Sequence, residues 1–247
     1  MRKKLEIMRQ EGPDTASYVQ TVIYETDDDH ATVATALREQ ENWRMEDGTP
    51  YRERPVRWEC SCLQKKCGAC AMRINGLPRL ACDTKLAECK GDTVKLEPLK
   101  KFPVICDLIT DRSVLMENLK ALSVWLNDTA EHKESGNDLA YEGSRCLQCG
   151  CCLEVCPNFL AGGPFAGMAV MVPFTRIIAQ IPEAQKKEIA KNYQDGVYNG
   201  CGKSLACHTV CPAGIDIEKL MVNSNSAAVW KRWLKKGSLV LSRERKA

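Results

Sequence analysis

Cysteine is the residue type in this sequence most able to do chemistry. The 247-residue chain contains 15 cysteines and only three histidines. Disulfides are rare in a reducing compartment, so a cysteine-rich chain there more often binds metal or does redox chemistry. An odd number also excludes pairing all of the cysteines within the chain. The spacing of the cysteines therefore decides which chemistry to expect.

The first group of cysteines has the spacing that holds a two-iron cluster. Cys62, Cys67 and Cys70 follow the pattern C-x4-C-x2-C, and Cys82 comes further along the chain. In plant-type [2Fe–2S] ferredoxins, three thiolates of this pattern converge from a tight loop and the fourth arrives from a later segment. A zinc site is the alternative, but zinc favours two C-x2–4-C pairs or a histidine partner. We therefore predict a [2Fe–2S] cluster.

The second group of cysteines matches the run found in bacterial ferredoxins. Cys146, Cys149, Cys152 and Cys156, followed by Pro157, fit the pattern C-x2-C-x2-C-x3-C-P. In this run the first three cysteines hold one [4Fe–4S] cluster, and the fourth reaches the other cluster of the pair.

The third group repeats the second with one substitution. Cys201, Cys207 and Cys211, followed by Pro212, have the same frame, but Ser204 stands where the second cysteine of the run should be. This degenerate repeat supplies one thiolate fewer than two four-iron clusters require.

Crossed ligation divides these cysteines into two sets. The set that is complete for a [4Fe–4S] cluster consists of Cys146, Cys149, Cys152 and Cys211. The other set has three thiolates, those of Cys156, Cys201 and Cys207. Three thiolates most simply hold a cluster that lacks one iron, so we predict [3Fe–4S]. Serine oxygen is a poorer ligand for such iron, and a labile or Ser204-ligated four-iron cluster is the alternative.

The remaining cysteines are predicted to be structural. Cys60 and Cys89 are interpreted as bystanders that pack as small hydrophobic side chains, and Cys151 is squeezed between two ligands. Cys106 stands alone in the sequence. No nucleophile–base pair or phosphate loop is recognisable, so we predict no catalytic residue. The histidines are scattered, and His208, beside a ligand, could tune a cluster or simply pack.

The bulk composition describes a globular chain. Its net charge of +3 is too small to indicate nucleic acid as the main partner, and no run approaches the ~18 apolar residues that span a bilayer. The N-terminus is basic but lacks the apolar run of a signal peptide. We therefore expect a cytoplasmic chain.

The elements that must position the cysteines differ between the two parts of the chain. The N-terminal part is expected to be β-rich, with a helix over 32–39, a hairpin turn at Asn75-Gly76 and strands over 5–9, 18–24 and 94–97. The C-terminal part is expected to be helical, with helices over 182–192 and, capped by Asp216, over 217–223. We expect an α+β protein with two domains, 1–106 and 107–247.

This arrangement resembles the iron–sulfur subunit of succinate dehydrogenase and fumarate reductase, the complex II family. The resemblance covers almost the whole chain and rests on residues 57–62, 67–72, 75–76, 80–82 and 102–108 together with the paired cysteine runs. It implies an N-terminal β-grasp plant-type ferredoxin domain and an all-helical, bacterial-ferredoxin-like domain with two clusters. It also implies an FAD-containing flavoprotein partner, where succinate and fumarate interconvert, and a quinone at membrane-anchor subunits.

Two positions depart from the ubiquinone-linked members of that family. Ala161 stands where many of them have tryptophan, and Gly202 where they have histidine. These differences favour a haem-bearing anchor that uses menaquinone, with this chain peripheral on the cytoplasmic face of the cell membrane. The tail Trp230–Ala247 carries seven basic residues and one acidic residue. It could lie on an anionic membrane surface, or equally be a solvated helix end with packing tryptophans.

Two other functions are open at this stage. The same clusters could serve a soluble flavin-dependent reductase, such as a thiol-linked fumarate reductase, although the cysteine–cysteine–glycine domains often attached in such relatives are lacking. A non-catalytic sensor or scaffold is the third hypothesis, and three graded clusters exceed what sensing needs.

Overall fold

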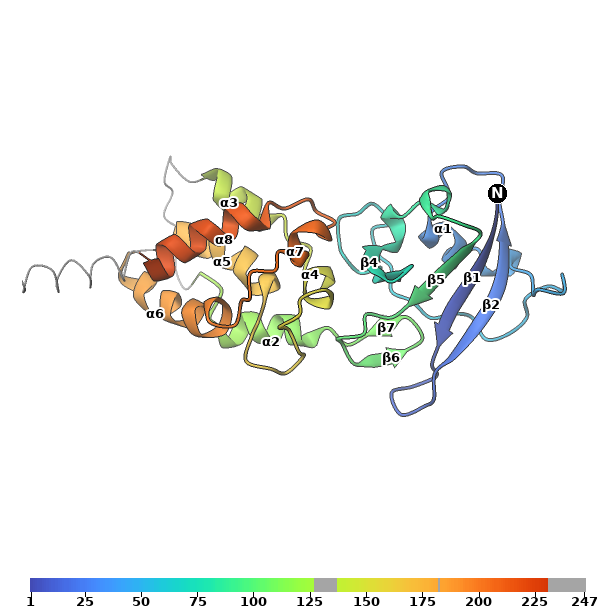
Figure 1. Cartoon of the computed structure of the whole chain (residues 1–247), viewed down its shortest axis with the longest axis horizontal. Coiled ribbons are helices and arrows are strands. Elements are labelled where there is room, and N and C mark those ends of the chain that lie inside the picture. Colours follow the sequence, from blue (N-terminus) through green and yellow to red (C-terminus); the bar gives the residue numbers. More distant parts are fainter. Residues whose placement is uncertain (127–136, 182, 231–247) are drawn as a thin grey trace, which may run out of the picture. The chain divides into compact units, whose positions relative to one another are not determined.

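A computed structural model describes residues 1–126, 137–181 and 183–230 of the chain (Figure 1). The described chain forms two compact units, neither of them continuous in sequence. The first unit consists of Met1–Arg112, Leu147–Val155 and Val210–Ala213, and the second of the described residues within 113–146, 156–209 and 214–230. The basic tail beyond Trp230 lies outside the described residues, as does Pro182 at the start of the predicted 182–192 helix.

A five-stranded sheet forms the first unit. Its strands lie in the order β2-β1-β5-β3-β4, with β1 and β5 parallel and the other neighbours antiparallel. The bounds are β1 (Arg2–Arg9), β2 (Tyr18–Glu25), β3 (Ala71–Ile74), β4 (Leu77–Leu80) and β5 (Thr93–Glu97). β1, β2 and β5 overlap the three strands predicted from the sequence, and β3 and β4 flank the predicted hairpin turn. The long blue arrows of β1 and β2 and the loop that joins them are plain in Figure 1.

Alternating side chains give the sheet its buried face. Leu5 and Ile7 of β1 are fully buried, and Leu5 pairs with Val22 on one side and Val94 on the other. Helix α1 (Val33–Arg38) buries four apolar side chains. It begins as predicted, because the Thr32 hydroxyl caps the helix by accepting a hydrogen bond from the N–H of Thr35.

Short elements complete the first unit. Asn75 and Gly76 form the predicted hairpin turn, both with positive φ, 50° and 82°. The first unit also contains three 3₁₀ turns. One, η1 (Gln40–Asn42), follows α1, and the other two, η2 (Ala81–Asp83) and η3 (Leu86–Glu88), lie between β4 and β5. A small hairpin of β6 (Val104–Cys106) and β7 (Ile109–Thr110) was not foreseen from the sequence. Helix α4 (Cys151–Glu154) also belongs to this unit and contacts β4.

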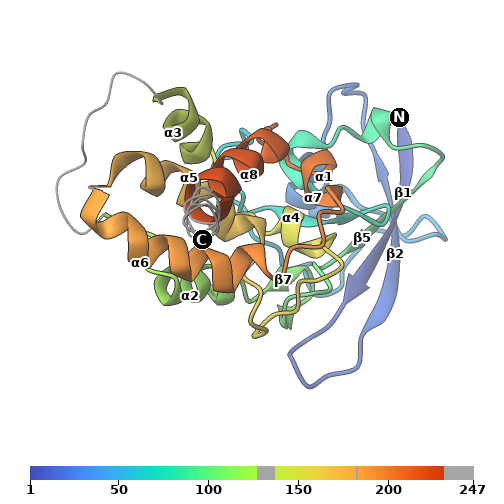
Figure 2. The same ribbon diagram turned by 60° about the vertical axis from the view of Figure 1, so that its left-hand side comes forward.

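The second unit is helical, as the sequence predicts. Helix α5 (Met168–Gln180) is its centre, because it contacts α2, α3, α6 and α8 (Figure 2). The bounds of α5's neighbours are α2 (Ser113–Ala121), α3 (Asn137–Ser144), α6 (Glu183–Tyr193) and α8 (Ile217–Asn225), and the short helix α7 (Ala206–Thr209) contacts α8. Two π-helical segments, η4 (Gln194–Tyr198) and η5 (Ser226–Trp230), extend α6 and α8. Of the helices in the described ranges, none has the length and apolar character needed to cross a bilayer.

Buried polar pairs join the helices of this unit. The hydroxyls of Thr175 and Ser224, on α5 and α8, lie 2.7 Å apart. Tyr193 donates a hydrogen bond of 2.7 Å to Asn225, and its ring stacks on Phe174. Asp216 caps α8 as predicted, because its carboxylate accepts the N–H of Lys219.

Candidate cluster-binding sites

The loop between Cys62 and Cys70 directs backbone N–H groups at cysteine sulfurs. The N–H groups of Gln64 and Lys66 each lie 3.3 Å from the sulfur of Cys62. The N–H of Lys65 lies 3.4 Å from the sulfur of Cys82. Hydrogen bonds of this kind stabilise negative charge on sulfur, which a cluster ligand must carry. The loop therefore fits a [2Fe–2S] cluster.

The four sulfurs of this group lie in two interacting pairs. The N–H groups of Gln64 and Lys66, together with the neighbouring Cys67 thiol, lower the pKa of Cys62 to about 7. Burial, reinforced by the negative charge of Cys82, raises the pKa of Cys70 to about 12. In the first pair Cys67 is exposed and Cys62 half-buried, whereas Cys70 of the second pair is buried. The loop thus brings together all four residues that the spacing selected.

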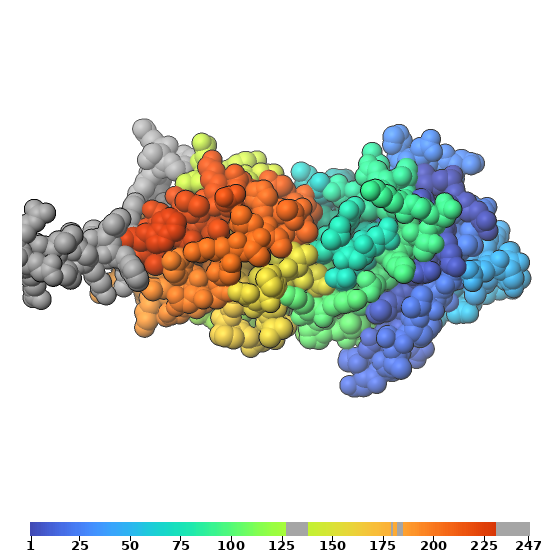
Figure 3. Space-filling view, in the orientation of Figure 1, coloured from blue at the N-terminus to red at the C-terminus, as the bar shows by residue number. Residues whose placement is uncertain are grey.

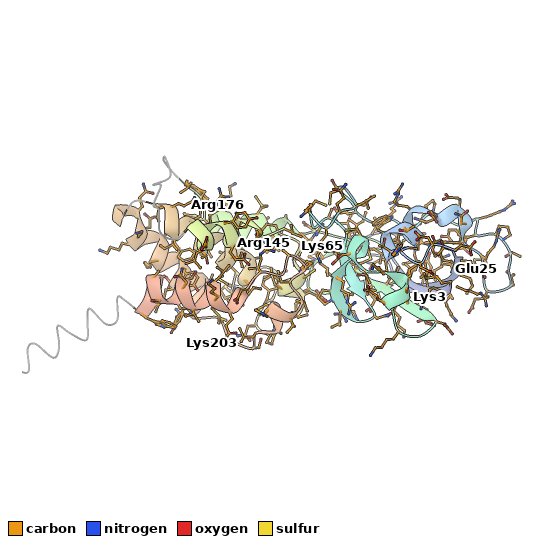
Figure 4. The ribbon with its side chains drawn as sticks, turned by 90° about the horizontal axis from the view of Figure 1, so that it is seen from above. Lys3, Glu25, Lys65, Arg145, Arg176 and Lys203 are labelled. Atoms are coloured by element: carbon orange, nitrogen blue, oxygen red, sulfur yellow. The ribbon has the colours of Figure 1, made fainter. Side chains whose placement is uncertain are left out.

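The loop reaches this shape through left-handed backbone. Leu63, Lys65 and Gly68 have φ values of 54°, 58° and 74°. Lys65 thus adopts the left-handed conformation that glycine adopts most readily. Its side chain, labelled in Figure 4, forms an ion pair of 2.7 Å with Asp83, next to Cys82. The loop segment lies at the surface, where its teal atoms are visible in Figure 3.

Gly68 brings the two-iron loop against the four-iron segment. A Cβ atom at Gly68 would lie 2.8 Å from the Cβ of Cys149 and 2.8 Å from the carbonyl oxygen of Leu147. Only glycine permits this approach, because any side chain would collide with backbone. The backbone between Cys67 and Cys70 is thus in direct contact with a cysteine of the [4Fe–4S] set.

Three of the four-iron cysteines belong to the first unit. These are Cys149, Cys152 and Cys211, and all three lie near Cys151. The pKa of Cys151 is raised by its hydrogen bond to Cys149, by burial and by the negative charges of these three neighbours. Cys151 is fully buried, and its thiol donates a hydrogen bond to the sulfur of Cys149. This hydrogen bond is the main reason that the pKa of Cys149 is lowered to about 7. Cys151 therefore has the structural place predicted for it, beside a ligand. The fourth member, Cys146, directly precedes this segment in the chain.

Glu154 fixes the four-iron segment to the rest of the first unit. Its buried carboxylate accepts hydrogen bonds from the N–H groups of Lys100 and Lys101, at 3.1 and 3.0 Å. It also forms an ion pair of 3.1 Å with Arg73 on β3. Phe102 packs under Gly150, where an added Cβ would lie 3.0 Å from the ring. The short helix α4 is therefore held at its C-terminal end by the bonds of Glu154 and at its N-terminal end by the packing of Gly150 on Phe102.

The three cysteines of the [3Fe–4S] set lie together in the second unit. Burial, followed by the negative charges of Cys156 and Cys201, raises the pKa of Cys207 to about 11. The sulfur of Cys201 lies 4.0 Å from that of Met221 on α8. Three thiols therefore converge at one place, beside a polarizable thioether.

The loop around Ser204 repeats the backbone of the four-iron loop. Gln148 and Gly150 have φ values of 50° and 85°, and the aligned residues Lys203 and Leu205 both have 56°. The conformation that a four-cysteine run needs is thus kept where the cysteine is replaced by serine. Lys203, labelled in Figure 4, lies over the ring of Tyr198, 5.6 Å from its centre.

Not every interpretation of the remaining cysteines is supported. Cys89 and Cys106 are buried, as small packing side chains are. Cys60 is exposed, so the interpretation that it packs as a small hydrophobic side chain is wrong. His208 is 43% exposed and lies 4.0 Å from Asp216, which fits a surface residue.

Within the ranges that the structure describes, no three or more His, Cys, Asp or Glu side chains are arranged to hold a single metal ion.

Two family models match the chain in the order of its two parts. The model described as "2Fe-2S iron-sulfur cluster binding domain" matches residues 4–117, and the one described as "4Fe-4S dicluster domain" matches residues 142–215. The succinate dehydrogenase iron–sulfur subunit of Bacillus subtilis is 36% identical over 173 residues, which are 66% of this chain and 68% of that protein. This chain belongs to the succinate dehydrogenase and fumarate reductase iron–sulfur subunit family.

Other members of this iron–sulfur subunit family extend the match over more of the chain. The fumarate reductase iron–sulfur subunit of Escherichia coli O157:H7 is 28% identical over 86% of this chain and 87% of its own length. A chain of the Mycobacterium smegmatis Sdh1 complex in the apo form has the same fold, with a TM-score of 0.72 at 21% identity, over 94% of this chain and 97% of its own length. The resemblance inferred from the cysteine spacing is confirmed.

Proposed function

We propose that this chain is the electron-transfer subunit of a succinate dehydrogenase or fumarate reductase. It relays electrons between FAD on a flavoprotein subunit and a quinone at a membrane anchor. The observation that supports this function is that a member of this family has three sets of neighbouring cysteines. Their spacing is that of ligands for a two-iron, a four-iron and a three-iron cluster. The substrate site belongs to the flavoprotein partner.

The proposed ligands are the cysteines selected by spacing. They are Cys62, Cys67, Cys70 and Cys82 for [2Fe–2S]; Cys146, Cys149, Cys152 and Cys211 for [4Fe–4S]; and Cys156, Cys201 and Cys207 for [3Fe–4S]. When bound, these clusters supply one-electron transfer. The chain's own residues hold thiolate charge through N–H donors, exclude water from the buried thiols and keep the ligand loops in contact.

The proposed domain folds follow from the same features. The strand order β2-β1-β5-β3-β4 with one covering helix fits a β-grasp ferredoxin domain over residues 1–106. The paired runs, with matching left-handed positions, fit a bacterial-ferredoxin-like helical domain over residues 107–247.

The proposed electron acceptor is menaquinone, at a haem-bearing anchor. Ala161 and Gly202 replace the tryptophan and histidine of ubiquinone-linked members. A Cβ at Gly202 would lie 3.0 Å from the side-chain nitrogen of Asn158, which donates a hydrogen bond of 2.6 Å to the carbonyl of Gly200. A side chain at position 202 would therefore require the Asn158 side chain to shift, which is consistent with a site built around glycine there. The complex would then lie on the cytoplasmic face of the cell membrane, with this chain as a peripheral subunit.

Purification of the native complex tests this function. We expect the chain to co-purify from detergent-solubilised membranes with a flavin-containing subunit, and to show EPR signals of three cluster types. Reduced menaquinone analogues should reduce the clusters, whereas ubiquinol analogues should do so poorly. A complex that is fully soluble without detergent would favour the soluble reductase, and zinc in place of iron would exclude both functions.

A further inference from the structure

Arg112 lies where the two-iron and four-iron ligand loops meet. It is the last residue of the long N-terminal segment of the first unit, just before α2. Its side chain is 16% exposed, so the guanidinium is largely withdrawn from water. Arg112 lies outside the cysteine patterns and outside the helices and strands, so neither the cysteine spacing nor secondary structure explains an arginine here.

The guanidinium of Arg112 bonds to both loops at once. One terminal nitrogen donates to the carbonyl of Gly68, at 3.0 Å, and to that of Cys149, at 3.3 Å. The other donates to the carbonyl of Ala69, at 3.1 Å, and to the carboxylate of Glu59. Gly68 and Ala69 lie between two proposed [2Fe–2S] ligands, and Cys149 is a proposed [4Fe–4S] ligand. A planar, multidentate donor suits such a junction better than an ammonium.

We propose that Arg112 is a positioning residue that locks the two ligand loops together and sets a fixed positive charge beside the four-iron site, with Glu59 as its counter-charge. This inference rests on the proposed function, since it concerns the same ligands. Gly68 lies against Cys149 so closely that no Cβ fits between them, and Arg112 bonds to the backbone carbonyls of both residues.

The charges of Arg112 and Glu59 should shift the reduction potential of the [4Fe–4S] cluster in opposite directions. A nearby positive charge favours the reduced, more negative state of a cluster, and a nearby carboxylate opposes it. Arg112→Gln should therefore lower the reduction potential of the [4Fe–4S] cluster, and Glu59→Gln should raise it. We expect changes on the order of tenfold in the one-electron equilibrium constant, which is about 59 mV. A merely structural role would not give shifts of opposite sign.

The experiment is a redox titration of the purified complex, followed by EPR and Mössbauer spectroscopy. Arg112→Lys keeps the positive charge but loses the forked set of donors, so the reduction potential of the [4Fe–4S] cluster should stay close to that of the wild type. It should alter the magnetic interaction between the reduced two-iron and four-iron clusters. Arg38→Gln, at an exposed arginine at the end of α1 in the same unit, is the matched control and should change neither quantity.

The outcomes separate this inference from the function on which it rests. Unchanged potentials in Arg112→Gln and Glu59→Gln, with full cluster content, would overturn the electrostatic role. An unchanged magnetic interaction in Arg112→Lys would overturn the locking role, even if Arg112→Gln fails to assemble. Absence of the clusters from the wild-type complex would instead overturn the proposed function itself.

Discussion

Ser204 sets the number of thiolates that the third site can offer. The loop around it has the left-handed positions of a four-cysteine run, with Lys203 and Leu205 both at a φ of 56°. The backbone is therefore already shaped for a fourth ligand at position 204. Among the ligand positions of this run, only position 204 differs, because serine offers an oxygen where the complete run has a sulfur.

Ser204→Cys is expected to convert the third cluster to [4Fe–4S]. A thiolate at this position completes the ligand set without a change of backbone, and thiolate is the ligand that iron–sulfur clusters prefer. The EPR signal of the oxidised [3Fe–4S] cluster should disappear, and iron content should rise by one atom per chain. Ser204→Ala is the matched control and should keep the three-iron signal. If Ser204→Ala changes that signal, the serine oxygen is itself a ligand.

At the scale of elements, α4 depends on its anchors. A helix of four residues has too few internal hydrogen bonds to be stable alone. Glu154 supplies the missing stability by accepting two backbone N–H groups and the charge of Arg73. Because Cys152 and Cys156 lie on either side of Glu154, this anchor also fixes where cluster ligands lie.

Glu154→Gln is expected to destabilise the four-iron segment by about 2 kcal/mol, because it weakens charge-assisted hydrogen bonds at a buried site. Heating should then bleach the visible absorption of the clusters at a lower temperature than in the wild-type protein. Glu88→Gln is the control, because Glu88 is 62% exposed and its ion pair with Lys85 contributes little. Equal bleaching temperatures for Glu154→Gln and wild type would contradict this anchoring role.

At the scale of the first unit, Asp107 joins segments that are far apart in sequence. Its fully buried carboxylate pairs with Arg9, 98 residues away at the end of β1, and with Arg54. It also accepts the N–H groups of Gln10 and Arg57, the latter just before the two-iron loop. Burial alone would raise the pKa of Asp107, but these donors outweigh burial and hold its pKa below the usual value of 3.8.

Asp107→Asn is expected to cost about 3–5 kcal/mol at neutral pH, because it leaves the buried Arg9 without its charged partner. The pKa of Asp107 is lowered by folding, so its contribution is present above the unfolded value and is lost as pH falls through the folded value. The difference between variant and wild type should therefore narrow below about pH 4. Anaerobic urea unfolding, followed by tryptophan fluorescence from pH 8 to pH 3, measures this. A difference independent of pH would show that the carboxylate charge is not the cause.

Much of the fold could be predicted because its causes are local. The apolar alternation of β1, the Thr32 cap and the Asn75-Gly76 turn each act over a few residues, and all three are confirmed. The β6–β7 hairpin was missed, because it is very short and depends on Asp107, which has a φ of 44° and bonds to distant arginines. Cys60 was misjudged because sequence spacing gives no measure of exposure.

The sequence by itself predicted a set of thiols for each cluster, because ligand spacing within a loop is a property of the chain. It also determined the family, since the two cysteine patterns occur in a fixed order. Only the tertiary structure revealed Arg112, Glu154 and Asp107 as the residues that hold these loops. Their partners are 37 to 98 residues away in sequence, and such contacts leave no local pattern. The cysteines therefore define the clusters, and buried charge pairs define how the ligand loops of the first unit meet.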